Sequence, residues 1–308
     1  MKNIHKLTVY LGSSGRCRPI FKDTATKFGH LIGEHNMELV YGGMDAGLMG
    51  IVANNALESG ARVTGIIPKK LKDSERIHPN LDQTILVPDL WERKLKMFQR
   101  ADAIITLPGG FGTIDEALEV LYWATLGSHA KPVIFVNTDN YWDGFITYLK
   151  SMSDLPHDYL LIANDVHHVF KLLEEWQPPK ITGDESHLPN FENQILEQID
   201  QPLIINQATV EQSYILATAL GLKQLDKHQR HMGLLNNNGQ FDALMNWITL
   251  AQTEHFITDR CTGLFSIATD IDALNAKLDK QKDIHIDLNQ EKWGPSETKT
   301  HIEIKETE

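Results

Sequence analysis

The chain has 308 residues, 42% hydrophobic and 23% charged, so it can bury a sizeable core. Its formal net charge of −12 argues against a broad nucleic-acid surface, which needs clustered cations. We find no apolar run long enough to span a bilayer and no signal-peptide pattern, and therefore expect a soluble, cytoplasmic protein without membrane contact. Its two cysteines, Cys17 and Cys261, predict neither a disulfide framework nor a metal site.

Strand and helix patterns alternate over the first 180 residues. Strands are expected at residues 7–11, 38–41, 62–67, 84–87, 103–107, 132–136 and 160–162. Helices are expected to begin near Pro19, Gly47 and Asp89, and within the turn that ends at Thr113. This alternation predicts an α/β fold built on a Rossmann-like, doubly wound parallel sheet with helices on both faces.

Three turns rich in glycine or serine follow strands, at residues 12–15, 42–50 and 108–113. Parallel sheets bind ligands at the carboxyl ends of their strands, so the three turns predict a ligand site. The third turn reads Pro108-Gly109-Gly110-Phe111-Gly112-Thr113 and precedes a helix. Such a turn presents backbone N–H groups and the positive end of a helix to a phosphate. A turn without a ligand is the alternative, and the density of glycine favours the phosphate site.

Charged side chains flank this turn. Asp115 and Glu116 fall in the first turn of the helix, and Glu119 shares a face with Glu116. Spacing alone does not choose among these acids. Arg93 and Lys94 precede the fifth strand, and the arginine fork suits phosphate, although such a pair on a helix is usually solvated surface.

The remainder of the chain resembles part of the first. After a linker at residues 177–189, a shift of 99 positions places Val133–Asn137 on 232–236. The glycine turn is then matched by residues 206–212, which contain no glycine and include Glu211, so the phosphate chemistry is lost. We predict a nucleotide-binding domain over 1–180, a degenerate partial repeat of the same α/β pattern over 181–280, and a polar, flexible tail over 281–308. Chance pairing of two α/β patterns is the alternative.

Three segments resemble the LONELY GUY (LOG) phosphoribohydrolases, whose motif is PGG-x-GT-x-x-E. They are Tyr41-Gly42-Gly43…Gly47-Leu48-Met49-Gly50, Arg93-Lys94, and Pro108–Glu116, and the resemblance covers about residues 5–178. It implies an enzyme that releases the base from a nucleoside 5′-monophosphate and leaves ribose 5-phosphate, with no cofactor and no metal. The base is an N6-modified adenine, a cytokinin, in some relatives and an ordinary base in others; the sequence does not choose between them.

The resemblance also implies residue roles. Arg93 and Glu116 would form the catalytic pair. The residues expected to bind the phosphate and the rest of the nucleotide are Gly12, Ser13, Gly42, Gly43, Met49, Lys94, Gly109, Gly110, Gly112 and Thr113. Met44 departs from the pattern, because a glycine is frequent at its position. The family usually forms dimers through helices near the site, which predicts a homodimer here, or a second part that packs against the first and takes the place of part of a partner.

Two other functions compete with the hydrolase. A non-catalytic nucleotide-binding or sensor protein would use the second part as an output surface, but it would not need the acid at Glu116. A Rossmann oxidoreductase is disfavoured, because no G-x-G-x-x-G opens the first helix.

Overall fold

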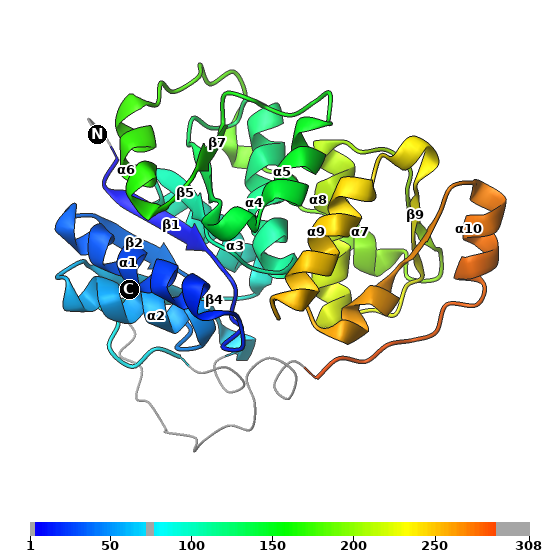
Figure 1. Cartoon of the computed structure of the whole chain (residues 1–308), viewed down its shortest axis with the longest axis horizontal. Helices are drawn as coiled ribbons and strands as arrows, with labels where there is room; N and C mark the ends of the chain where they lie inside the picture. Colours follow the sequence, from blue (N-terminus) through cyan, green and yellow to red (C-terminus); the bar gives the residue numbers. More distant parts are fainter. Residues whose placement is uncertain (1–3, 72–76, 288–308) are drawn as a thin grey trace.

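The computed structural model describes residues 4–71 and 77–287 (Figure 1). Most of the predicted tail, from residue 288 onward, lies outside these ranges. Seven parallel strands form one sheet in the order β4-β3-β2-β1-β5-β6-β7. They are β1 (Lys6–Tyr10), β2 (Glu38–Tyr41), β3 (Val63–Pro68), β4 (Gln83–Val87), β5 (Ala103–Thr106), β6 (Val133–Val136) and β7 (Leu160–Ala163). The predicted doubly wound α/β sheet is confirmed.

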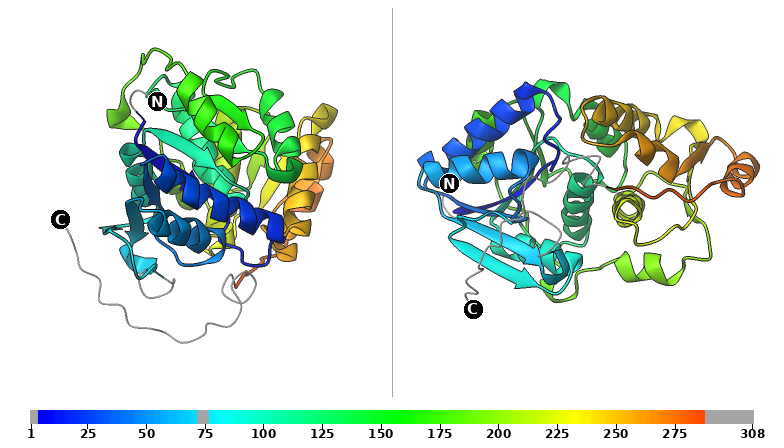
Figure 2. Two further views of the ribbon diagram at one scale, coloured as in Figure 1. Left: turned by 60° about the vertical axis from the view of Figure 1, so that its left-hand side comes forward. Right: turned by 90° about the horizontal axis from the view of Figure 1, so that it is seen from below.

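Helices cover both faces of this sheet. They are α1 (Pro19–Glu34), α2 (Gly47–Glu58), α3 (Leu90–Arg100), α4 (Phe111–Thr125), α5 (Asp143–Lys150) and α6 (Val166–Glu175), with short 3-10 turns at Lys69–Leu71 and Thr138–Asn140. Helix α1 contacts α2 and α6 on one face, whereas α3 and α4 pack on the other (Figure 2). Strands β3, β5 and β6 are buried along their whole length, which explains their continuous apolar sequences. Within the described ranges, no helix has the length and apolar character needed to cross a bilayer.

The direction of winding reverses between β1 and β5. From β1 the chain passes through α1 to β2 on one side, and from β5 it passes through α4 to β6 on the other. Ligands bind at such a switch point, outside the carboxyl ends of the two strands. Two of the predicted turns meet there, because Gly12 donates its N–H to the carbonyl of Pro108 at 3.0 Å.

Residues 190–278 form a smaller α/β unit beside the sheet. Its parallel sheet has the order β10-β9-β8, and α8 lies along α4 while α9 lies along α5 (Figures 1 and 2). Its elements are α7 (Glu192–Glu197), β8 (Leu203–Ile205), α8 (Val210–Gln224), β9 (Met232–Leu235), α9 (Asp242–Thr253), β10 (Ser266–Ala268) and α10 (Ile271–Leu278), with short 3-10 turns at Asn237–Gly239 and Asp259–Leu264. A further 3-10 turn, Glu185–His187, lies in the segment that precedes the unit.

The two parts correspond at an offset of 99 residues. Helices α8 and α9 begin 99 residues after α4 and α5. Side-chain contacts follow the same offset: His129 Nε2 lies 2.9 Å from the carbonyl of Val120, and His228 Nε2 lies 3.0 Å from that of Ala219. These correspondences support the predicted repeat. That the second part is a degenerate copy, with domains divided at residue 180, stays a prediction.

Candidate active site

A cleft opens at the switch point, between α3, α4 and α8. It is partly open, and its empty volume, counting the part open to solvent, is about 1120 Å³. Ten of the predicted site residues line it: Gly12, Ser13, Gly42, Met49, Arg93, Lys94, Gly110, Gly112, Thr113 and Glu116. The other two, Gly43 and Gly109, are not among the residues that line it.

The first turn of α4 forms one end of the cleft. This helix begins after Gly110, which provides no side-chain cap. The N–H of Thr113 donates to the Gly110 carbonyl at 3.0 Å, so the N–H groups that precede it, such as that of Gly112, are the ones available to an anion. The glycines of the turn differ in their surroundings. A Cβ on Gly109 would overlap the Oγ1 of Thr113 and lie 2.8 Å from the N of Gly12, so packing requires this glycine. A Cβ on Gly112 would meet nothing within 4 Å, so the space beside it is open to a ligand.

Arg93 enters the cleft from the first turn of α3. The side chain of Asp89 caps this helix by accepting from the N–H of Glu92 at 2.9 Å, which fixes the turn that carries Arg93. The Arg93 guanidinium lies against Gly42, where any Cβ would overlap Nη2. Its buried Nε has no hydrogen-bond partner among the described residues. Because a buried donor without a partner is costly, this guanidinium is suited to receive an anionic ligand.

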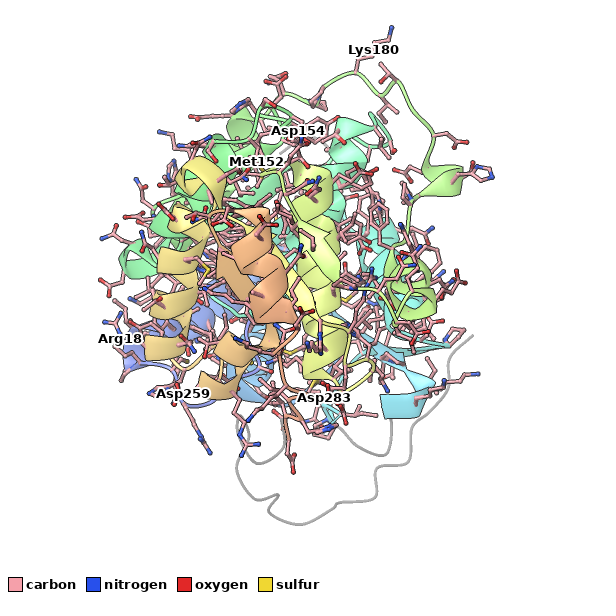
Figure 3. All side chains as sticks on the ribbon, turned by 90° about the vertical axis from the view of Figure 1, so that its right-hand side faces the viewer. Arg18, Met152, Asp154, Lys180, Asp259 and Asp283 are labelled. Carbon is pink, nitrogen blue, oxygen red and sulfur yellow. The ribbon has the colours of Figure 1, made fainter. Side chains whose placement is uncertain are left out.

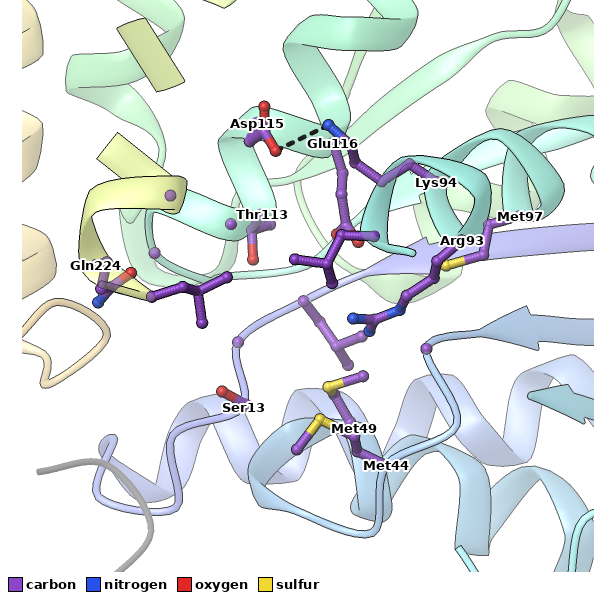
Figure 4. A pocket seen from close by; sticks show the side chains of 18 of the residues that line it. Ser13, Met44, Met49, Arg93, Lys94, Met97, Thr113, Asp115, Glu116 and Gln224 are labelled. Carbon is purple, nitrogen blue, oxygen red and sulfur yellow. Dashed lines mark hydrogen bonds and ion pairs between the residues drawn. The ribbon is translucent and has the colours of Figure 1, made fainter. Parts of the chain in front are cut away.

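The structure separates the acids that spacing left equivalent. Lys94 Nζ lies 3.1 Å from Asp115 Oδ2 and 3.2 Å from Glu119 Oε1, so these two carboxylates are held by one buried cation. Glu116 makes no hydrogen bond with another described residue. It points into the cleft, as does Arg93 (Figure 4). Lys94 lines the cleft as predicted, yet its ammonium group is directed at carboxylates, and its direct contact with a nucleotide stays a prediction.

Burial changes the ionisation of this group. It raises the pKa of Glu116 to about 7, with the nearby Arg93 acting in the opposite direction. It raises the pKa of Glu119 to about 8, again opposed by a cation, Lys94. For Lys94, burial lowers the pKa, but Asp115 and Glu119 raise it by more, so the lysine stays charged. Near neutral pH, Glu116 therefore exchanges a proton readily, as a general acid or base requires.

Methionines form an apolar side of the cleft. Met44 and Met49 lie opposite Arg93 and Glu116, and Met97 lies beside Arg93 on α3 (Figure 4). Met44, the departure from the family pattern, is therefore part of the cleft. Thioether side chains are polarizable and adapt to flat aromatic surfaces, so this side suits a base.

Sequence reasoning proposed that the second part packs against the first, but it named no cleft residue in the second part. Glu192, Thr218 and Gln224 also line the cleft. The Thr218 hydroxyl donates to Asp115 Oδ1 at 2.6 Å, and Glu192 Oε1 lies 3.6 Å from Lys94 Nζ. No motif marks these residues; the only signal in the sequence was the offset that aligns α8 with α4.

Comparison with known proteins gives consistent matches. A family model described as "Possible lysine decarboxylase" matches residues 49–173. The cytokinin riboside 5′-monophosphate phosphoribohydrolase LOG2 of Arabidopsis thaliana is 36% identical over 179 residues, which cover 56% of this chain and 84% of LOG2. LOG7 of the same plant is 35% identical over 203 residues, 61% of this chain and 94% of LOG7.

A solved structure described as the molybdenum cofactor binding protein from Rippkaea orientalis is 21% identical, with a TM-score of 0.46, and covers 56% of this chain and 98% of its own. The family model ends before the second part begins. The matches to the plant enzymes extend over most of each enzyme's length. The chain therefore belongs to the LOG family of cytokinin riboside 5′-monophosphate phosphoribohydrolases.

Proposed function

We propose that this protein hydrolyses the N-glycosidic bond of a nucleoside 5′-monophosphate and releases the free base and ribose 5-phosphate. One observation carries the proposal: Arg93 and Glu116 share a cleft with the uncapped start of α4. A phosphate would bind at the helix start, which would bring the ribose toward the acid. The names of the plant relatives support the same reaction.

The proposed chemistry uses side chains alone. Phosphate oxygens would accept hydrogen bonds from the N–H of Gly112 and from the hydroxyl of Thr113, at the first turn of α4. As the C1′–N bond breaks, its electron pair leaves with the base and positive charge develops on the ribose, which the Glu116 carboxylate stabilises. Water adds its hydroxyl to C1′, and its proton passes through Glu116 to the base. Arg93 would orient the nucleotide and offset negative charge.

The proposed substrate class is an N6-modified adenosine monophosphate or an ordinary nucleotide, with its base against Met44 and Met49. The protein is proposed to act in the cytoplasm, without binding nucleic acid or membrane. A homodimer, which the resemblance implies, would need a surface other than α4 and α5, because α8 and α9 cover both helices.

The test is a ribose 5-phosphate release assay on the full chain. AMP, GMP, CMP, UMP and N6-isopentenyl AMP are compared, each with wild type and Glu116→Gln. Release by wild type and its loss in the variant support the hydrolase, and the ranking of substrates identifies the preferred base. Equal release by both proteins would exclude Glu116 as the catalytic acid.

The competing function is non-catalytic nucleotide binding, with the second part as an output surface. The contact of Thr218 with the acid cluster beside the cleft favours this alternative, because it connects the cleft to the second part. Calorimetry that detects binding of these nucleotides, together with no release from any of them, would support it.

A further inference from the structure

The contact between α4 and α8 is reciprocal. Thr218 donates to Asp115, and the Tyr214 hydroxyl donates to Glu119. Asp115 and Tyr214 are equivalent at the offset of 99 residues, as are Glu119 and Thr218. Each helix therefore uses the same two positions, in exchanged roles, to contact the other. Such an exchange is the property of a two-fold interface, in which i contacts j and j contacts i.

The contact between α5 and α9 follows the same axis. Gly144 packs against Ala243, its own equivalent at the offset, and a Cβ on Gly144 would lie 3.0 Å from the Ala243 carbonyl oxygen. A position that meets its own equivalent lies at a two-fold axis. Nearby, the rings of Trp142 and Trp247 stack at a centroid distance of 5.6 Å.

The loops that follow these helices are exchanged as well. Asp154, from the loop after α5, accepts from the N–H of Val210 at the start of α8 at 3.0 Å (Figure 3). Phe256, from the loop after α9, packs against Gly12 and Gly110, beside the start of α4. A Cβ on Gly110 would lie 2.5 Å from the Phe256 carbonyl oxygen, and one on Gly12 would lie 2.6 Å from its ring.

We propose that residues 190–278 take the place that a second copy of residues 103–175 would occupy, and that they complete the nucleotide cleft within one chain. The inference rests on the proposed function and adds to it the residues that shape specificity. Thr218, Leu222 and Gln224, on the C-terminal half of α8, line the cleft and are almost fully buried. We call these three residues the α8 wall; Gln224 is labelled in Figure 4. The Gln224 amide donates to Cys261 Sγ at 3.4 Å, which orients it within this wall.

The internal pair has one site. The start of α8 is occupied by Asp154, and Glu211 stands where α4 has Gly112. These two carboxylates would repel a phosphate at the start of α8. Helix α8 therefore provides no second phosphate site and only lines the cleft at the start of α4.

The wall is tested through substrate discrimination. Leu222→Ala and Gln224→Ala are compared with wild type for kcat/KM on AMP and on N6-isopentenyl AMP, and for AMP affinity by calorimetry. Each wall variant should change the ratio of kcat/KM for the two substrates, or the affinity for AMP, by about threefold or more. Loss of one side-chain contact in a binding pocket typically changes discrimination between substrates by at least this factor. Gln194→Ala, on an exposed position of α7, is the matched control and should leave both unchanged. Wall variants equal to wild type in both measurements would overturn the inference. Absent turnover with intact AMP binding would contradict the proposed function alone, and the affinities would still test the wall.

Mixing two inactive variants tests whether the cleft of each chain is completed by α8 of the same chain. Glu116→Gln lacks the acid, and Leu222→Glu places a charge in the wall. If each chain completes its own cleft, an equal mixture of the two should release no more ribose 5-phosphate than the separate proteins do. Recovery of activity in the mixture would mean that α8 of one chain completes the cleft of another, which overturns the inference. Leu222→Gln serves as a second wall variant, and thermal melts confirm that each protein is folded.

Discussion

Helices α4 and α8 begin at equivalent positions, yet their first turns have opposite chemistry. The start of α4 has no side-chain cap, and Gly112 leaves open space beside it. At the start of α8, Thr209 accepts from the N–H of Gln212 at 3.2 Å, and Val210 donates to Asp154. The backbone of any helix start favours an anion, so the side chains decide whether that anion is a ligand or the protein's own carboxylate.

The same contrast extends along the two helices. The acids Asp115, Glu116 and Glu119 of α4 correspond to Tyr214, Ile215 and Thr218 of α8. The second helix thus lacks all three charges. The hydroxyl groups of Thr218 and Tyr214 instead hold Asp115 and Glu119, and of the three acids only Glu116 is left without a hydrogen-bond partner among the described residues. One helix keeps the reactive groups, and the other fixes their geometry.

The largest effect is expected from removal of Glu116, an acid that has no counterpart on α8. Glu116→Gln should lower kcat by about 10³-fold, within the usual range for loss of a general acid–base group, and leave AMP affinity nearly unchanged. Steady-state kinetics and calorimetry measure the two effects. Glu174→Gln, on the exposed side of α6, is the matched control and should behave as wild type. A large loss of affinity in Glu116→Gln would assign this side chain to binding.

The next substitution gives α4 the residue of α8. Gly112→Glu should weaken AMP binding by about 100-fold, because it places a negative charge beside the phosphate. Because a Cβ on Gly112 would meet no neighbour, the unfolding free energy should change by no more than about 0.5–1 kcal/mol. Replacing a helical glycine with a residue of higher helix propensity should contribute in the stabilising direction. Gly112→Gln separates charge from size, and binding as tight as wild type in Gly112→Glu would place the phosphate elsewhere.

The pH profile tests the state of Glu116. If the ionised acid is required, kcat/KM should fall about tenfold per pH unit below its pKa of about 7 and become level above it. Arg93→Ala should move this midpoint upward, because the guanidinium lowers the Glu116 pKa. Initial rates between about pH 5 and 8 measure both. A flat profile would mean that the ionisation of Glu116 does not limit the reaction.

The smallest effect is expected from removal of Asp154, the carboxylate that accepts a hydrogen bond from the start of α8. Asp154→Ala should lower the unfolding free energy by about 0.5–1 kcal/mol, since it removes an exposed carboxylate at a helix start, and should leave kcat/KM unchanged. Denaturant titration measures the first and steady-state kinetics the second. Asp158→Ala, in the same loop, should change neither. A tenfold loss of activity in Asp154→Ala would show that the start of α8 acts on the cleft.

Patterns that depend on one segment were predictable from the sequence. The strand predicted at residues 38–41 coincides with β2, and the helix expected at Pro19 begins there, because burial periodicity and proline chemistry are local. The order of strands and the difference between Gly109 and Gly112 were not predictable. Both depend on segments brought together only by the fold.

The acids illustrate the limit. Asp115, Glu116 and Glu119 share one helix, and spacing could not rank them. Lys94, from α3, and Thr218, from α8, hold two of the three. Asp115 lines the cleft as Glu116 does, but only Glu116 has no hydrogen-bond partner among the described residues. The family motif had already indicated Glu116, but without the physical reason that these contacts provide. The assignment of the site residues stays a prediction that the variants above test.

The reciprocal contact has a consequence for how the protein can change. In a homodimer, each substitution appears twice, once on either side of the axis, and both copies must tolerate it. Here the two sides are encoded separately, as Gly144 and Ala243 illustrate at the axis itself. Substitutions in the cleft-lining residues of α8 can therefore change the preferred base while the phosphate site on α4 keeps its sequence.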